Sequence, residues 1–211
     1  MPSNASIRAF NRRRFLGLAS TVTAATVVPR RVLGGAGNVP PSDRLNVAII
    51  GAGGQGITNL KELLRHPDVQ IAALCDVAEF WDNSHLYYRH HGGRGPAKRA
   101  LEEHHRDAGT ARPPAVGMHV DYRRMLERSG RDIDAVLIAA PNHIHAVAAR
   151  AAMQAGQGVY CEKPLTHSIH EARVILDLVK EHKNVTQMGN QIHSDLHNYR
   201  RVVEQIQSAM I

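Results

Sequence analysis

Several features are scarce in this chain of 211 residues, and each scarcity excludes a class of protein. Aromatic residues make up only 4% of the sequence, so few side chains are available to stack on nucleic-acid bases. The mostly apolar stretch near the N-terminus, residues 15–28, is shorter than the roughly 20 residues that a membrane-spanning helix needs. We therefore expect neither a nucleic-acid partner nor a membrane span.

Acidic residues and lysine are absent from the first 42 residues, which hold six of the 26 basic residues, all arginine. The remaining chain carries 20 basic against 19 acidic residues, so the net charge of +7 belongs almost entirely to the N-terminal segment. A nucleic-acid-binding domain would instead carry its basic residues clustered on the folded part. The charge therefore indicates a basic leader before a nearly neutral globular domain.

Part of this leader has the pattern of an export signal. Residues 11–17 read Asn-Arg-Arg-Arg-Phe-Leu-Gly, which resembles the twin-arginine signal, and the apolar stretch that follows has the length of a signal-peptide core. We interpret residues 1–36 as a twin-arginine signal and linker. We therefore expect export by the twin-arginine machinery to the periplasm or another extracytoplasmic space, with a disordered basic tail as the alternative.

The most informative motif is a glycine pattern that follows a short apolar run. Residues 46–50 predict a buried strand, the next six read G-A-G-G-Q-G, and the amphipathic stretch 57–65 predicts a helix. In this G-x-G-x-x-G turn, backbone N–H groups and the helix dipole can hold a pyrophosphate. The first glycine allows the tight turn, the second lets the phosphates approach, and the third lets the helix pack on its strand. The residues expected to bind a dinucleotide here are Gly51, Gly53, Gly54, Gln55 and Gly56.

A carboxylate stands where this dinucleotide motif requires one. A second apolar run, residues 69–75, ends in Asp76, about 20 residues past the last glycine, and a carboxylate at this spacing binds the ribose hydroxyls. No arginine follows in residues 77–79, so the 2′-phosphate of NADP would meet negative charge without a compensating cation. We therefore expect NAD as the cofactor, with NADP less favoured.

The rest of the chain alternates apolar runs with amphipathic stretches. This alternation predicts an α/β fold with a doubly wound, mostly parallel sheet, the Rossmann fold, over residues 44–192. Further strands are expected within residues 115–120, 135–139, 158–161 and 185–188, in the sheet order 3-2-1-4-5-6. A polar, glycine-rich excursion is expected up to Pro96, followed by a helix over 97–105. The sheet order separates Cys75 from Cys161 by two strands, so we expect no disulfide.

Polar residues follow four of these strands, at the end where ligands bind in such sheets. They are Asp76, Pro141, Asn142, Glu162, Lys163 and Gln191. Because the carboxyl ends of parallel strands share one edge, we expect these side chains to gather on one rim. Two histidine pairs, at 90–91 and 104–105, lack the spacing of a metal site, so no metal is expected.

Together these elements resemble the family of glucose-fructose oxidoreductase, inositol dehydrogenase and MocA (Gfo/Idh/MocA). The resemblance extends from about residue 44 to the end of the chain, and its motifs are the glycine turn with Asp76, Pro-Asn-His-Ile-His at 141–145, Glu-Lys-Pro-Leu at 162–165 and Gly-Asn-Gln at 189–191. It implies an NAD(P)-dependent oxidoreductase that transfers a hydride between nicotinamide and a sugar or cyclitol hydroxyl. Family members form oligomers and carry a second α/β domain. We expect that domain to be absent here, with a helix in 193–211 leading into it, which leaves the substrate site incomplete.

The resemblance also implies roles for individual residues. Those that would line the cofactor groove are Pro141, Asn142, His145 and Glu162. Lys163 would be the catalytic residue, binding the substrate and polarising its hydroxyl, with Gln191 also at the substrate. The resemblance also implies a cis peptide before Pro164, which a proline tolerates because its tertiary amide lowers the preference for trans to about 0.5–1 kcal/mol.

Three other functions remain open. An NAD-dependent glycosidase of the same family would oxidise its substrate transiently to eliminate the glycosidic bond. A nucleotide-binding module without catalytic activity would bind the dinucleotide only. A methyltransferase shares the glycine motif and the acid at a strand end, but not the Glu-Lys-Pro segment.

Overall fold

The computed structural model describes residues 39–191 and 199–210. The predicted twin-arginine signal at 1–36 lies outside these residues, as does the part of the predicted C-terminal segment at 192–198 and 211. The chain divides after Asp43 into two units: a short 3-10 helix, η1 (Pro41–Asp43), belongs to the first, and the second, Arg44–Ile211, contains the sheet. No helix among the described residues is long and apolar enough to cross a membrane.

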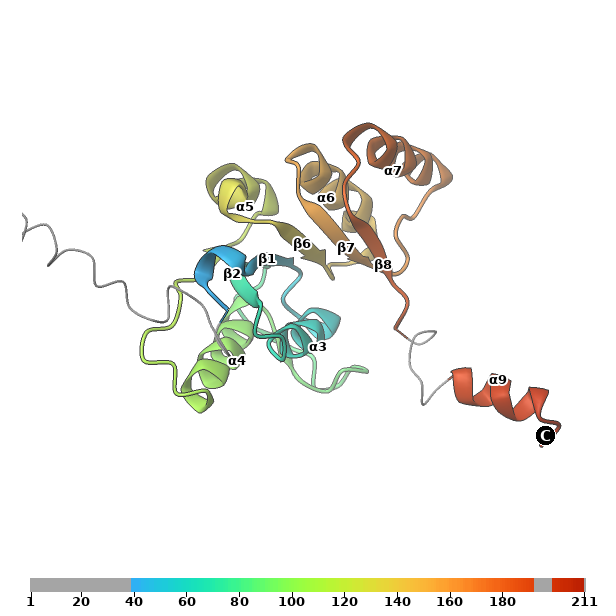
Figure 1. Cartoon of the computed structure of the whole chain (residues 1–211), viewed down its shortest axis with the longest axis horizontal. Helices are drawn as coiled ribbons and strands as arrows, with labels where there is room; N and C mark the ends of the chain where they lie inside the picture. The colour runs from blue at the N-terminus through green and yellow to red at the C-terminus, as the bar shows by residue number, and fades with distance from the viewer. Residues whose placement is uncertain (1–38, 192–198, 211) are drawn as a thin grey trace, which may run out of the picture. The chain divides into compact units, whose positions relative to one another are not determined.

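Six parallel strands form the sheet of the second unit (Figure 1). In spatial order they are β5 (Gly117–His119), β2 (Val69–Cys75), β1 (Leu45–Ile50), β6 (Ala135–Ile138), β7 (Gly158–Glu162) and β8 (Thr186–Gly189). Counted along the chain this is the order 3-2-1-4-5-6, so the predicted doubly wound sheet is confirmed. Each strand also lies inside its predicted range or within one residue of it.

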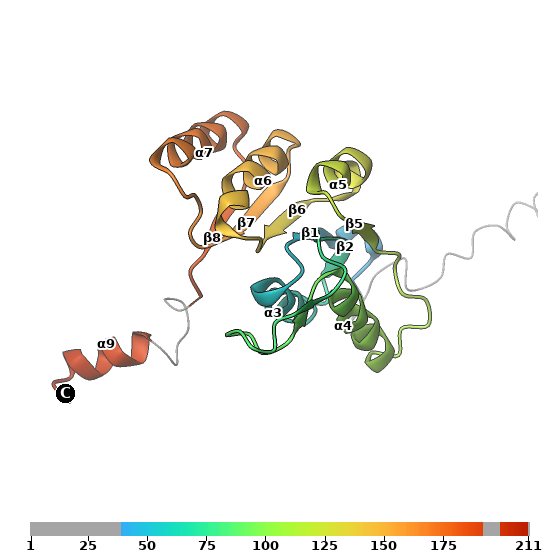
Figure 2. The ribbon, with the colours of Figure 1, turned by 180° about the vertical axis from the view of Figure 1, so that it is seen from behind.

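Helices cover both faces of this sheet (Figures 1 and 2). One face packs against α3 (Gly54–Leu63) and α4 (Arg94–Asp107), through Leu60, Leu101 and the strand residue Leu74. The other face packs against α5 (Tyr122–Ser129), α6 (Asn142–Gln154) and α7 (Ile169–His182). Leu60 and Leu74 are fully buried, and each such side chain contributes about 1.5–3 kcal/mol of transfer free energy. The two cores hold the carboxyl ends of the strands in fixed positions.

Two helix boundaries and one hairpin differ from the prediction. Helix α3 begins at Gly54 with Gly53 as its N-cap, three residues before the predicted start, because the glycines form its first turn. Helix α4 likewise begins at Arg94 rather than at residue 97. The predicted excursion contains a short antiparallel pair, β3 (Trp81–Asp82) and β4 (His91–Gly92), and strands of two residues leave no periodic pattern in a sequence. The remaining elements are η2 (Gly130–Asp132) and α9 (Tyr199–Gln207).

The two cysteines are buried free thiols in different parts of the sheet. Cys75 ends β2 and Cys161 lies in β7, with β1 and β6 between them, which is the separation predicted from the strand order. Burial, assisted by the neighbouring charges of Asp76 and Glu162 respectively, raises the pKa of each thiol to about 12. Both thiols are therefore protonated at neutral pH and pack as small apolar side chains.

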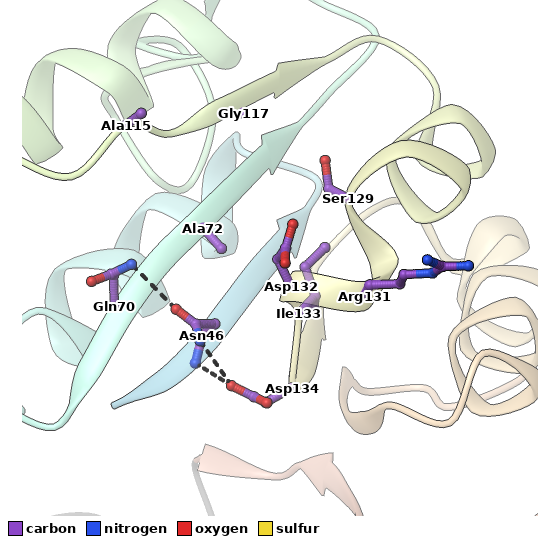
Figure 3. Close-up of a pocket in the computed structure, with 10 residues that line it drawn as sticks. All are labelled: Asn46, Gln70, Ala72, Ala115, Gly117, Ser129, Arg131, Asp132, Ile133 and Asp134. Atoms are coloured by element: carbon purple, nitrogen blue, oxygen red, sulfur yellow. Dashed lines mark hydrogen bonds between the residues drawn. The ribbon is translucent and has the colours of Figure 1, made fainter. Parts of the chain in front are cut away.

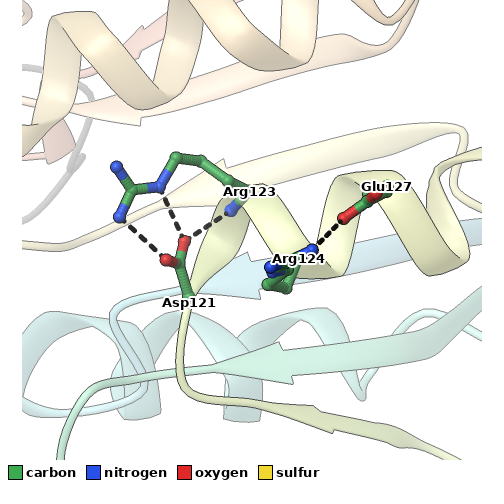
Figure 4. Close-up of polar contacts among 4 residues, drawn as sticks. All are labelled: Asp121, Arg123, Arg124 and Glu127. Carbon is green, nitrogen blue, oxygen red and sulfur yellow. Dashed lines mark hydrogen bonds and ion pairs between the residues drawn. The ribbon is translucent and has the colours of Figure 1, made fainter.

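Asp121 fixes the start of α5 (Figure 4). Its Oδ1 accepts hydrogen bonds from the backbone N–H and the Nε of Arg123, each at 2.9 Å, and its Oδ2 accepts one from Nη2 at 2.8 Å. One turn later Arg124 bonds Glu127 at 2.8 Å. The hydrogen bonds from Arg123 lower the pKa of Asp121 to about 2, so this cap is charged over nearly the whole pH range.

Candidate active site

The predicted site residues lie at the carboxyl edge of the sheet. Strands β1 and β6 are neighbours, and the chain winds away from them in opposite directions, so the loops that follow them flank the switch point where such sheets bind ligands. Asp76 directly follows β2, and Glu162 and Lys163 stand at the end of β7. Pro141 and Asn142 are exposed at the start of α6, after β6. The sequence therefore located this edge correctly.

At two of the three motif glycines, a side chain would clash with the backbone of the folded chain. Gly51 has φ +88°, and a Cβ there would lie 2.5–2.7 Å from backbone atoms of residues 139–140. A Cβ at Gly56 would lie 1.8 Å from the carbonyl oxygen of Gly51, so only glycine lets α3 approach its strand. The tight turn predicted for Gly51 and the close packing predicted for Gly56 are both present. Gly54 also has a positive φ, +42°, which the motif alone did not indicate.

The middle glycine, Gly53, has no such reason within the folded chain. Its φ of −111° is open to any residue, and a Cβ there would meet its nearest atom, the backbone N of Gly93, at an ordinary 3.6 Å. The packing of the described residues therefore does not require glycine at this position. A ligand that approaches the backbone closely would require it, and this is the role that the dinucleotide motif gives to its second glycine.

Asp76 is joined to the glycine turn by hydrogen bonds. Its Oδ2 accepts from the backbone N–H of Ala52 at 2.8 Å, and its Oδ1 accepts from that of Ala78 at 2.9 Å. Each carboxylate oxygen can accept about two hydrogen bonds. The carboxylate is therefore oriented by the backbone and retains acceptor capacity for a hydroxyl of a bound ribose.

Arg94, which the sequence analysis did not single out, lies beside Asp76. Its guanidinium donates to the backbone carbonyl of Asp76 and forms an ion pair with Glu79 at 2.8 Å, and its side chain is only 13% exposed. No arginine stands in the three residues after Asp76, whereas this one comes from the start of α4. A cation thus stands near the predicted ribose site, but Glu79 already neutralises it.

Glu162 lies in a buried chain of polar side chains instead of on an open rim. It is 6% exposed, and its Oε1 accepts hydrogen bonds from Asn59 at 2.7 Å and from Gln191. Asn59 in turn accepts from Gln55 at 2.8 Å. A buried charge is stable only when such partners replace water. This network of four hydrogen-bonded side chains connects α3 to β7 and to the residue after β8. Asn59 is the one of the four that the sequence did not point to.

His145 connects the loops that follow β6 and β7. Its ring lies 2.6 Å (Nδ1) from the carbonyl oxygen of Pro164 and 2.7 Å (Nε2) from that of Ala140. The ring is only 1% exposed, so His145 positions the two loops, and its predicted place in the cofactor groove stays a prediction. The Lys163-Pro164 peptide is cis, as expected. Lys163 itself is exposed, and no hydrogen bond or ion pair joins it to another described residue.

A second polar cavity, of about 400 Å³, lies at the opposite, amino edge of the sheet (Figure 3). Gln70 donates to Asn46 at 3.2 Å, and the backbone N–H and Nδ2 of Asn46 donate to Asp134 at 2.7 and 3.1 Å. Arg131 points away from this network in Figure 3. Asn46, Gln70 and Asp134 thus bond to one another, which gives these three residues a structural role. Among the described residues, no group of three or more His, Cys, Asp or Glu could hold a metal ion.

Comparison with known proteins gives the family. The family model described as "Oxidoreductase family, NAD-binding Rossmann fold" matches residues 45–190. A glycosyl hydrolase family 109 protein of Stenotrophomonas maltophilia is 34% identical over 157 residues, which is 73% of this chain and 30% of that protein. A levoglucosan dehydrogenase of Pseudarthrobacter phenanthrenivorans is 41% identical over 81 residues, 38% of this chain and 18% of that protein. The chain thus spans less than a third of the length of these two relatives.

Solved structures share the fold. A myo-inositol 2-dehydrogenase of Lactobacillus plantarum superposes with a TM-score of 0.56 at 26% identity, over 80% of this chain and 42% of that one. A scyllo-inositol dehydrogenase of Lactobacillus casei, solved with NAD(H) and scyllo-inositol, gives the same TM-score at 20% identity, over 80% and 42%. With a family model over most of its length and the glycine turn, Asp76 and the strand order in place, the chain belongs to the Gfo/Idh/MocA oxidoreductase family and contains its NAD-binding Rossmann domain.

Proposed function

We propose that the protein is an NAD-dependent oxidoreductase that transfers a hydride between nicotinamide and a hydroxyl-bearing carbon of a sugar or cyclitol. The observation that carries this proposal is Gly53, a glycine that the protein's own packing does not require, beside an Asp76 carboxylate oriented by the same turn. The names of the inositol and levoglucosan dehydrogenases among the similar proteins support the substrate class.

The residues of the glycine turn fit a dinucleotide. The N–H groups at the start of α3 would hold the pyrophosphate, and Asp76 would accept hydrogen bonds from the adenosine ribose. Two carboxylates, Asp76 and Glu79, and an Arg94 already paired with one of them disfavour a 2′-phosphate, which supports NAD over NADP. When bound, the nicotinamide would donate or accept the hydride.

The residues after β7 would act on the substrate. The ammonium group of Lys163 would donate a hydrogen bond to the reacting hydroxyl oxygen and stabilise the negative charge that develops there. His145 would keep the Lys163 loop at a fixed distance from the loop after β6, through its contacts with Pro164 and Ala140. The buried Glu162 chain would hold α3 against β7, so that the turn and the lysine keep their spacing.

A glycosidase of the same family is the second candidate. The relative named as a glycosyl hydrolase family 109 protein is 34% identical and favours it. Both candidates require the same nucleotide site. They differ in the product, because the oxidoreductase changes the oxidation state of its substrate and the glycosidase cleaves a glycosidic bond. A binding module without catalysis is the third candidate.

Two measurements on the purified chain distinguish these candidates. Calorimetric titration with NADH and NADPH is expected to show binding, with NADH the tighter ligand. Absorbance at the NADH band, followed over a panel of sugars and cyclitols, is expected to show turnover that Lys163→Met abolishes while NADH binding persists. Release of nitrophenol from nitrophenyl glycosides with NAD would favour the glycosidase, and binding without any turnover would favour the module. A folded chain that binds neither nucleotide would refute all three.

We also propose that residues 1–36 direct export by the twin-arginine route, which carries proteins already folded around their cofactor. The support is the Arg-Arg-Arg-Phe-Leu pattern at 12–16 and the apolar stretch after it. In cell fractionation the chain should reach the periplasm, and the double variant Arg12→Lys, Arg13→Lys should retain it in the cytoplasm. Equal export of both would contradict the proposal.

A further inference from the structure

The segment between β2 and α4, residues 77–93, is not used in the proposed mechanism, yet it lies against the glycine turn. We name it the aromatic flap. We propose that this flap forms one wall of the dinucleotide site and that Tyr88 is a cofactor-binding residue. The inference rests on the proposed function, because the ligand in question is the nicotinamide dinucleotide of that site.

The base of the flap is fixed to the glycine turn. The backbone N–H of Gly93 donates to the carbonyl of Ala52 at 3.2 Å. A Cβ at Gly92 would lie 2.8 Å from the Cα of Gly53, so the two backbones are in direct contact. A Cβ at Gly92 would also lie 2.8 Å from the side-chain nitrogen of Asn83, a residue that is only 7% exposed. The end of the flap and the side chain of Asn83 therefore lie beside Gly53, the glycine that a ligand is expected to approach.

The ring of Tyr88 reaches the start of α3. A Cβ built on Gly54 would lie 3.0 Å from its Cε2 and 3.1 Å from its Cδ2, so the ring covers the first residue of the helix. Burial, and next the negative charge of Glu162, raise the pKa of Tyr88. The phenol therefore stays protonated at neutral pH.

This position suits contact with a dinucleotide. The N–H groups of the first turn of α3 would hold the pyrophosphate, and the ring of Tyr88 lies against the first residue of that turn. A tyrosine there offers a flat apolar ring and a neutral hydroxyl donor, so it can contact ribose or phosphate oxygens without adding charge. Tyr88 is 37% exposed, which leaves part of the ring accessible to a ligand.

The composition of the flap supports the same conclusion. The chain has nine aromatic residues, and three of them, Phe80, Trp81 and Tyr88, stand in the flap with between 37% and 56% of their surface exposed. Exposed aromatic side chains gathered in one place are typical of contact surfaces. Tyr87 provides a control of the same residue type, because its side chain is 90% exposed, whereas the ring of Tyr88 covers Gly54.

The test measures the dissociation constant of NADH for the full chain and three variants. Quenching of Trp81, the only tryptophan, reports binding, and calorimetry checks it. Tyr88→Ala should raise the dissociation constant about tenfold, the equivalent of about 1.4 kcal/mol. Tyr88→Phe keeps the ring and should raise it about two- to threefold. Tyr87→Ala should leave it within about twofold of the parent value.

The outcomes separate this inference from the proposed function. If the folded parent chain binds neither NADH nor NADPH, the proposed function fails. Suppose that the parent binds NADH and that Tyr88→Ala binds it equally well, or that Tyr87→Ala weakens binding as much as Tyr88→Ala does. Then the role of Tyr88 and the flap in binding is overturned, and the proposed function is not. Far-UV circular dichroism verifies that the variants are folded. Should Tyr88→Ala not fold, Tyr88→Trp in a Trp81→Phe background replaces it: bound NADH should quench its emission, and unquenched emission overturns the proposal.

Discussion

The two edges of the central sheet both carry polar side chains but use them differently. At the amino edge, Asn46, Gln70 and Asp134 bond to one another and fix β1 to its neighbours. At the carboxyl edge, Asp76 is oriented by backbone N–H groups with acceptor capacity to spare, and Lys163 has no described partner. Polar groups that satisfy one another build the fold, whereas groups that are oriented but not satisfied are available to a ligand. Three variants test this difference, and a fourth, at Asp121, gives the effect of a charge that belongs to neither edge.

The largest effect is expected from Gly56→Ala at the carboxyl edge. The added Cβ would lie 1.8 Å from the carbonyl oxygen of Gly51, so α3 must move away from its strand. We expect the free energy of unfolding in urea to fall by about 3 kcal/mol or more, with loss of NADH binding. Gly130→Ala is the matched control: its φ is −58° and its nearest neighbour would be Nε2 of Gln157 at 3.4 Å. It should change stability by less than about 1 kcal/mol, and equal losses would contradict the steric argument.

Asp76→Ala should affect binding more than folding. It removes the carboxylate expected to accept from the ribose, and hydrogen bonds to charged groups contribute about 1.5–3 kcal/mol. The dissociation constant of NADH, measured by calorimetry, should therefore rise by about 10- to 100-fold. Asp134→Ala at the amino edge should leave it within about twofold. A similar loss of affinity in both variants would show that the two edges do not differ in function.

Asp134→Ala should instead affect stability. It removes the acceptor of two hydrogen bonds from Asn46, at 2.7 and 3.1 Å, and water can replace them in part because Asp134 is exposed. We expect the free energy of unfolding to fall by about 1 kcal/mol. Asp134→Asn retains an acceptor oxygen and should lose less. An unchanged urea midpoint in Asp134→Ala would show that the amino-edge network does not stabilise the sheet.

The smallest effect is expected at Asp121, which serves neither edge's network. Its pKa is lowered to about 2 by the hydrogen bonds from Arg123, so the folded state binds a proton less readily than the unfolded state. Its contribution to stability is therefore complete above the unfolded pKa of about 4 and is lost as the pH falls towards 2. Asp121→Asn keeps the helix cap and removes the charge. Unfolding measured between pH 5 and pH 2 should then show a shallower acid dependence, and an identical slope would contradict the assignment.

The sequence was sufficient for the parts of the molecule that follow regular spacing. The glycine turn, Asp76 and the strand order all come from short motifs and the alternation of strands with helices, and parallel strands necessarily bring their carboxyl ends to one edge. Pro141, Asn142, Glu162 and Lys163 were therefore located correctly along that edge. Their orientation was not predictable from spacing: Glu162 turns inward, and Lys163 stays exposed.

The contacts that the sequence did not reveal join residues far apart in the chain. Asn59 meets Glu162 across 103 residues, and Arg94 reaches Asp76 from the next helix. His145 meets two carbonyl groups from different loops, those of Pro164 and Ala140, which the sequence did not indicate. The path of the aromatic flap depends on two strands of two residues each, too short to leave a pattern. Such contacts depend on tertiary proximity, for which local periodicity carries no information.

The state of the two thiols has a practical consequence. Maleimide reagents attack the thiolate, and both native cysteines are buried with a pKa of about 12. A third cysteine introduced on the surface, as in Tyr87→Cys, would then carry a dye or spin label by itself, with the native pair left in place. The approach of the labelled flap to an added nucleotide could be followed directly in the otherwise unaltered protein.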